Sequence, residues 1–193
     1  MPYSWPNVGN DDKIDFYAYN GGTFQYNSGV PYINFTAVDE TPASTIDLLV
    51  AKHKQISYND GYNGEKGVVT LTFDHACAAV DFNIRSKKAE PVTIREVILN
   101  DVKKTARYHY GTDSWDNIGN GSTTTYYLHA GSPFTLATDE TNTLDALGTV
   151  FFIPQTLSTV TVRYTVNDAN KKATFTLDKA LAKGESYTIN IEL

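Results

Sequence analysis

Apolar and polar residues alternate with a period of two along most of the chain, and no segment sustains the helical period of 3.6. In the clearest stretch, apolar Val160, Val162 and Tyr164 alternate with polar Thr161 and Arg163. Such alternation directs one row of side chains toward a core and the other toward water, which is typical of a half-buried β-strand. The C-terminus of the chain repeats this pattern.

Other short segments are rich in β-branched and aromatic residues and are separated by Gly, Asn, Asp and Ser, which favour turns. The predicted strands are Ile14–Tyr19, Tyr32–Val38, Ile46–Ala51, Val68–Phe73, Val80–Arg85, 92–99, Ala106–Tyr110, Thr124–His129, Val150–Ile153, 160–166, Ala173–Leu177 and 187–193. Strand 92–99 has apolar residues at both parities, which predicts a bulge or burial on both faces. Residues Asn167–Asn170 predict a hairpin turn. The fold class is therefore predicted to be all-β, as a sandwich.

The segment Tyr58–Gly67, with the sequence YNDGYNGEKG, is the strongest loop signal in the chain. It predicts an N-terminal β domain over residues 1–60, a linker over 61–67 and a C-terminal β-sandwich over 68–193. Only three or four predicted strands precede the loop, and so few strands rarely close a sandwich alone. The N-terminal domain is therefore expected to be incomplete.

Composition and charge exclude several function classes. The chain has 193 residues, with 16 Lys and Arg against 22 Asp and Glu, a formal charge of −6 and a pI near 5.1. No basic face for nucleic acid is visible, so a nucleic-acid partner is not expected. The motifs of phosphate-binding loops, serine hydrolases and zinc proteases are missing, so neither an enzyme nor a cofactor is predicted.

A succession of short motifs runs through nearly the whole chain in a specific order and spacing. They are Tyr3-Ser4-Trp5-Pro6, Asp15–Tyr19, Asp47–Ala51, Val69–His75, Val80–Ile84, Thr93–Asn100, Phe152-Ile153-Pro154-Gln155, Val162-Arg163-Tyr164 and Gly184–Ile189. Through them the chain resembles the fimbrillin-like family, the surface pilins and adhesins of anaerobic gut and oral bacteria.

The resemblance implies two transthyretin-like, Greek-key β-sandwich domains and a non-enzymatic role in a fimbria (pilus) or in adhesion at the cell surface. It implies a lipoprotein precursor at the outer membrane, with other pilin subunits as partners through strand donation and host glycans or proteins as further partners. Residues 1–6 lack the basic and apolar regions of a signal peptide. Since family members carry such a signal and more N-terminal domain, we expect this chain to be truncated or shortened.

If subunits assemble by strand donation, the C-terminal strand is a candidate for the assembly edge. A donated strand gains affinity from backbone hydrogen bonds along an open edge, while alternate side chains fill pockets. The predicted assembly edge is accordingly the strand with Tyr187, Ile189, Ile191 and Leu193.

A set of aromatic residues suggests an alternative function, a surface module that binds carbohydrate or glycoprotein. The proposed ligand platform consists of Trp115, Tyr108, Tyr110, Tyr126 and Tyr127. The competing interpretation places Trp115 at one end of the C-terminal sandwich, with the tyrosine hydroxyls at its wet rim.

The single cysteine, Cys77, lies near His75 and Asp74, which invites comparison with a cysteine nucleophile and its base. On a strand, however, residues 75 and 77 lie about 6–7 Å apart, too far for the required hydrogen bond. Apolar parity changes between Phe73 and Val80, which predicts a bulge or a sheet-switching corner of small residues at Ala76–Ala79. Cys77 is therefore interpreted as a packed core residue.

No metal site is predicted. The remaining histidines, His53, His109 and His129, lie on different predicted strands without a partner at ligand spacing. Two groups of oxygen-bearing residues could serve either calcium or tight turns, and turns are the preferred interpretation. These groups are Asn59, Asp60, Asn63 and Glu65, and Asp113, Asp116 and Asn117.

Overall fold

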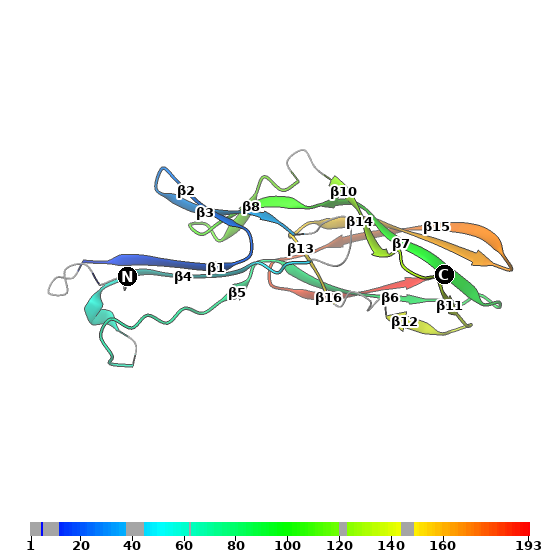
Figure 1. Cartoon of the computed structure of the whole chain (residues 1–193), viewed down its shortest axis with the longest axis horizontal. Helices are drawn as coiled ribbons and strands as arrows, with labels where there is room; N and C mark the ends of the chain where they lie inside the picture. The colour runs from blue at the N-terminus through cyan, green and yellow to red at the C-terminus, as the bar shows by residue number, and fades with distance from the viewer. Residues whose placement is uncertain (1–4, 6–11, 38–44, 62, 120–122, 144–148) are drawn as a thin grey trace.

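The computed structural model describes residues 5, 12–37, 45–61, 63–119, 123–143 and 149–193. Within these ranges the chain is all-β, as predicted, and its strands form four sheets. The only helical element among them is a single 3₁₀ turn, η2 (Tyr58–Asp60). Figure 1 shows two of the sheets at one end of the molecule and two at the other.

Sheets 1 and 2 lie at the left of Figure 1. Sheet 1 has the order β1-β4-β5 and sheet 2 the order β2-β3-β8-β9. The strands of sheet 1 are β1 (Ile14–Asn20), β4 (Leu49–Ile56) and β5 (Asp74–His75). Those of sheet 2 are β2 (Thr23–Asn27), β3 (Val30–Thr36), β8 (Thr105–His109) and β9 (Ser114–Asp116). Val38, predicted to end one strand, lies outside the described residues.

Sheets 3 and 4 lie at the right of Figure 1. In sheet 3, β6 pairs with β12, β13 and β16, and sheet 4 has the order β10-β7-β14-β15 with β11 also on β7. The strands of sheet 3 are β6 (Ala78–Arg85), β12 (Thr141–Thr143), β13 (Val150–Phe152) and β16 (Ser186–Glu192). Those of sheet 4 are β7 (Val92–Lys103), β10 (Thr123–His129), β11 (Phe134–Leu136), β14 (Thr156–Val166) and β15 (Ala169–Ala180).

The chain crosses from one end of the molecule to the other between β7 and β8. Only Lys104 separates the end of β7 from the start of β8, yet β7 belongs to sheet 4 and β8 pairs with β3 of sheet 2. The hairpin β8–β9 therefore adds two strands to a sheet that otherwise comes from the first part of the chain. Strands β2 and β3 of the predicted N-terminal domain thus share a sheet with β8 and β9 of the predicted C-terminal domain.

Several local predictions are confirmed. β14 and β15 form a hairpin whose two connecting residues, Asn167 and Asp168, both have positive φ, as a tight hairpin turn requires. Strand β7 contains a register shift and is buried at consecutive positions, including Val97 and Leu99. The chain also switches from sheet 1 to sheet 3 between β5 and β6, at the small residues around Ala76.

The prediction of a strand at Val68–Phe73 is wrong, because the structure has no strand there. Regular pairing with β4 starts only at Asp74 and is limited to Leu49 and Val50 of β4. Val68 and Phe73 remain 40% and 45% exposed. An apolar, β-branched segment forms a strand only where its backbone pairs with a neighbouring strand and its side chains pack in a core. This segment does neither.

Aromatic contacts join the facing sheets at both ends. Tyr17 of sheet 1 packs against Tyr110, next to β8 of sheet 2, with ring centroids 5.0 Å apart. Tyr126 of sheet 4 packs against Phe152 of sheet 3 at 5.8 Å. Buried residues from all four sheets form one hydrophobic cluster, so the sheets stack face to face as in sandwich packing.

Candidate functional site

Strand β16 forms an edge of sheet 3. It runs parallel to β6 along its whole length, from Ser186 opposite Ala79 to Glu192 opposite Arg85. In the part of the chain that the structure describes, β6 is its only ladder partner. Figure 1 shows β16 in red beside β6. The outer side of β16 is therefore an open edge.

The hydrogen bonds at the end of β16 show which backbone groups face outward. Leu193 donates its N–H to the carbonyl of Arg85 and accepts from the N–H of Lys87, both at 2.9 Å. In a parallel ladder the bonded residues of one strand alternate, so odd-numbered residues of β16 bond β6. The N–H and C=O groups of Thr188 and Asn190 consequently point to the open edge.

The predicted assembly residues form the inner face of this strand. Ile189 and Ile191 are buried, while Tyr187 and Leu193 are half-buried and pack against the same hydrophobic cluster. The Tyr187 hydroxyl accepts a hydrogen bond from the N–H of Ala182 at 2.9 Å. These side chains therefore anchor β16 to its own core and do not involve its outward backbone groups.

The opposite face of β16 is held to β6 by polar pairs. Asn83 donates to the side-chain oxygen of Asn190 at 3.0 Å, and Glu192 pairs with Arg85 and Lys87, both at 2.9 Å. The pKa of Glu192 is lowered, chiefly by its hydrogen bond from Lys87. Both faces thus fix the position of β16 without using its outward backbone groups.

Charge distinguishes this edge from the edge of sheet 4. Strand β15 ends sheet 4 and carries exposed Lys171, Lys172 and Lys179, and edge lysines are a common protection against strand pairing. Strand β16 contains no Lys or Arg. Sequence reasoning named the inward residues of β16 and missed Thr188 and Asn190, although the alternation of apolar residues also marks these positions.

The aromatic residues proposed as a ligand platform do not share one surface. Tyr108 and Tyr110 are 1% and 0% exposed and lie between sheets 1 and 2, while Tyr126 is 0% exposed in sheet 4. Half-buried Trp115 donates its indole N–H to the carbonyl of Ala76 at 2.9 Å. Half-buried Tyr127 lies on β10 in sheet 4. The structure does bring Tyr108 into edge-to-face contact with Tyr110 and Trp115, with ring centroids 5.6 and 5.4 Å apart. These contacts are internal packing, and Tyr126 and Tyr127 lie on a different sheet, so the five rings do not form a stacking surface for a sugar.

Two of the tyrosine hydroxyls have structural partners, while the buried Tyr126 hydroxyl has no hydrogen-bond partner among the described residues. Tyr110 donates to the carbonyl of Ala18 at 2.8 Å, and Tyr108 donates to the carboxylate of Asp113. Burial raises the pKa of both tyrosines. Burial also raises the pKa of Asp113, but hydrogen bonds from Lys183 and Tyr108 outweigh this effect and leave the pKa lowered.

Cys77 is buried, as expected for a packed core residue, with 1% exposure. Burial is the main cause that raises the pKa of its thiol to about 12. His75 is exposed and pairs with Asp47. A reactive cysteine needs a stabilised thiolate, and this environment favours the neutral thiol.

Alkylation of Cys77 by iodoacetamide at pH 8 is expected to be slow in the native protein. With a pKa of about 12, only about one thiol in 10⁴ is ionised at that pH, and the sulfur is also buried. Denaturation in urea should raise the rate by at least about a hundredfold, measured by mass spectrometry over time. Equal rates in native and denatured protein would contradict this assignment.

The histidines and carboxylates do not form a metal centre in the described ranges. No group of three or more His, Cys, Asp or Glu side chains there could hold a metal ion. His53 contacts the carbonyl of Thr70 and His109 pairs with Asp116, at 3.2 and 2.9 Å. Asp60 accepts from the N–H of Ser57 at 2.7 Å, which lowers its pKa, and this contact stabilises a turn.

Among the described residues, the fold is that of an all-β protein of stacked sheets in which the outer backbone edge of β16 has no ladder partner. The chain belongs to the fimbrillin-like family, because the model of that family matches residues 3–193. No curated protein matches the chain. No helix in the described part of the chain has the length and apolar character needed to cross a membrane.

Solved structures of Bacteroides proteins are similar to this chain. A candidate cell adhesion protein of Bacteroides uniformis ATCC 8492 has a TM-score of 0.60 and 18% identity, over 98% of this chain and 70% of its own. Candidate cell adhesion proteins of Bacteroides thetaiotaomicron VPI-5482 and Bacteroides ovatus ATCC 8483 have TM-scores of 0.45 and 0.48 and identities of 13% and 16%. They are matched over 95% and 94% of this chain and over 67% and 63% of their own chains.

Proposed function

We propose that this protein is a non-enzymatic subunit of a surface fimbria, in a stalk, tip or accessory position, that assembles through the open edge of β16. Family membership supports the fimbrial role, and the B. uniformis structure supports the fold. The observation that carries the assembly proposal is an edge strand without lysine or arginine whose outward backbone groups have no ladder partner among the described residues.

The partner on this edge would be a strand from another fimbrillin subunit. Backbone hydrogen bonds to Thr188 and Asn190 would extend sheet 3 by one strand, as in other complexes formed by strand addition. The inward anchors Ile189 and Ile191 would stay in their own core. Location at the outer membrane and the lipoprotein precursor belong to the same proposal and rest on the family.

Replacing Thr188 with proline tests the edge directly. Its N–H points outward, so Thr188→Pro removes no bond to β6 but removes one donor and places a ring on the open edge. We expect self-association to weaken about tenfold or more. Light scattering over a concentration series, before and after limited trypsin treatment, measures this effect.

The matched control is Thr188→Val, which keeps the N–H and a β-branched side chain. This variant should associate like the native protein, and both variants should unfold at similar urea concentrations. Unchanged association of Thr188→Pro would overturn the assembly edge. A native chain that remains monomeric both before and after trypsin treatment would also overturn it.

A further inference from the structure

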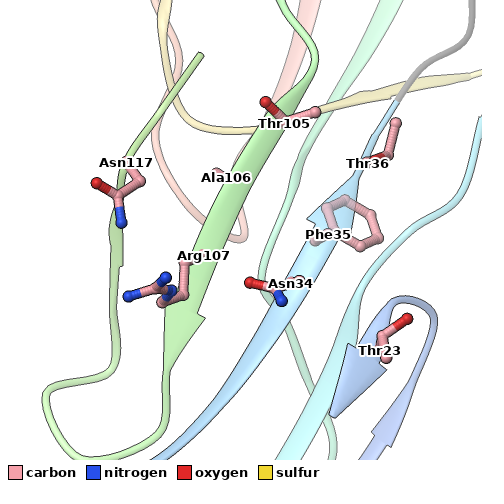
Figure 2. A pocket seen from close by; sticks show the side chains of 8 residues that line it. All are labelled: Thr23, Asn34, Phe35, Thr36, Thr105, Ala106, Arg107 and Asn117. Carbon is pink, nitrogen blue, oxygen red and sulfur yellow. The ribbon is translucent and has the colours of Figure 1, made fainter. Parts of the chain in front are cut away.

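The outer face of sheet 2 contains a polar hollow that the fimbrial proposal does not use. Its volume is about 400 Å³, and Figure 2 shows the side chains around it. The polar side chains of the hollow come from β2, β3, β8 and the residue after β9. They are Thr23, Asn34, Thr36, Thr105, Arg107 and Asn117.

Strand register brings these polar residues onto one face. Asn34 of β3 lies opposite Thr23 of β2 on one side and Arg107 of β8 on the other. Their neighbours Ile33 and Ala106 are buried on the inner face. Side chains held on paired strands keep their relative positions, so the hollow is preformed.

Arg107 provides the charge of the hollow. Its guanidinium lies over the ring of Tyr32, 4.4 Å from the centroid. Its Nε atom is buried and has no hydrogen-bond partner in the described structure. Asp116 lies opposite Arg107 in the ladder but bonds His109 at 2.9 Å. Arg107 therefore forms no ion pair with the described residues, in a chain with a net charge of −6.

We propose that this hollow binds the carboxylate-bearing sugar ring of an acidic saccharide. The outer nitrogens of Arg107 would pair with the carboxylate, because a guanidinium forms a planar fork that matches it. The amides of Asn34 and Asn117 and the hydroxyls of Thr23 and Thr36 would bond sugar hydroxyls. The hollow has the size of a small-ligand site.

The composition of the hollow favours this ligand class over other anions. Only one cationic side chain lines the hollow, whereas phosphate has a higher charge that clusters of cations usually balance. Apolar side chains do not dominate the lining, so a hydrophobic peptide anchor has no pocket to fill. Several short hydroxyl and amide side chains around a single cation match a ligand with one carboxylate and many hydroxyls.

The test uses isothermal titration of the full chain with two pairs of probes. Methyl glucuronide is compared with methyl glucoside, and sialyllactose with lactose, so that only the acidic part differs within each pair. We expect at least one acid to bind and its neutral counterpart to bind about tenfold more weakly or not at all. Binding of methyl glucuronide would identify uronate polysaccharides as the source of the ligand, and binding of sialyllactose would identify sialylated glycans.

Variants then locate the binding. Arg107→Gln should reduce affinity for the acid about tenfold or more, and Arg107→Lys should have an intermediate effect because the charge remains without the fork. Arg163→Gln is the matched control, since Arg163 lies on sheet 4 and is paired with Glu96 at 2.8 Å. It should bind like the native protein.

Absence of binding to both acids would overturn the proposal. Equal binding of acidic and neutral sugars, or unchanged binding by a folded Arg107→Gln variant, would do the same. The hollow lies in sheet 2 and the assembly edge in sheet 3, so either proposal can fail without the other.

Discussion

Replacing Phe152 with alanine is expected to lower the free energy of unfolding by about 3–5 kcal/mol. Phe152 on β13 is 0% exposed and packs against Phe82 and Tyr126, with ring centroids 6.3 and 5.8 Å away. It thereby joins sheets 3 and 4. Loss of the ring would remove buried apolar surface and leave a cavity that neighbouring rings fill only partly.

Urea denaturation followed by tryptophan fluorescence measures this change. The adjacent residue offers a matched control, because Phe151 is only half-buried and faces the other side of β13. Phe151→Ala should therefore have a clearly smaller effect. Equal destabilisation by the two substitutions would contradict the assignment of Phe152 as the central contact between these sheets.

Replacing Gln155 with methionine should lower the free energy of unfolding by about 2–4 kcal/mol. The Gln155 side chain accepts from the N–H of Lys103 at 2.8 Å and donates to the carbonyls of Lys103 and Ile153 at 2.9 and 3.2 Å. It is only 8% exposed. Methionine has a similar size, so the variant removes hydrogen bonds while largely preserving volume, and leaves buried backbone groups unpaired.

The position of these bonds gives them a larger structural role. Lys103 ends β7, just before the chain crosses to β8. We therefore expect Gln155→Met to increase amide hydrogen exchange in β8 as well as around Lys103 itself. Gln25→Met, on β2, is the control and should change stability by less than about 0.5 kcal/mol. Native stability and exchange in Gln155→Met would show that these bonds are dispensable.

Local sequence chemistry predicted much of the fold. The alternation of apolar residues in β14 and β16 identified both strands, because half-buried strands require side chains to alternate between core and water. The Asn167-Asp168 turn was predictable because both residues tolerate positive φ. The apolar parity change near Ala76 likewise indicated the switch between sheets.

Which strands pair with each other was not predictable from the sequence in the same way. The hairpin β8–β9 reads as part of the second half of the chain, but β8 pairs with β3. Residues 68–73 have strand composition but no ladder. Hydrogen bonding between strands is a relation between distant segments, and a single sequence gives no register for it.

For the candidate sites, too, the sequence predicted some features and not others. The apolar residues of β16 could be named from their alternation, but the open backbone edge beside them depends on which strands pair with β6. For Tyr108, Tyr110 and Tyr126, the sequence left open both a ligand platform and packing in the sandwich with the hydroxyls at its rim. Burial placed all three inside, because large aromatic rings gain most when they fill the space between facing sheets.

The sequence by itself determined the all-β class, the main strands and turns and, through its ordered motifs, the resemblance to the fimbrillin-like family that the match over residues 3–193 confirms. These properties depend on local preference and residue order. Only the tertiary structure decided that β16 has an open edge and that Arg107 joins Asn34 in a polar hollow. Both depend on strand order and register, which arise when distant segments compete for backbone partners and for a shared core.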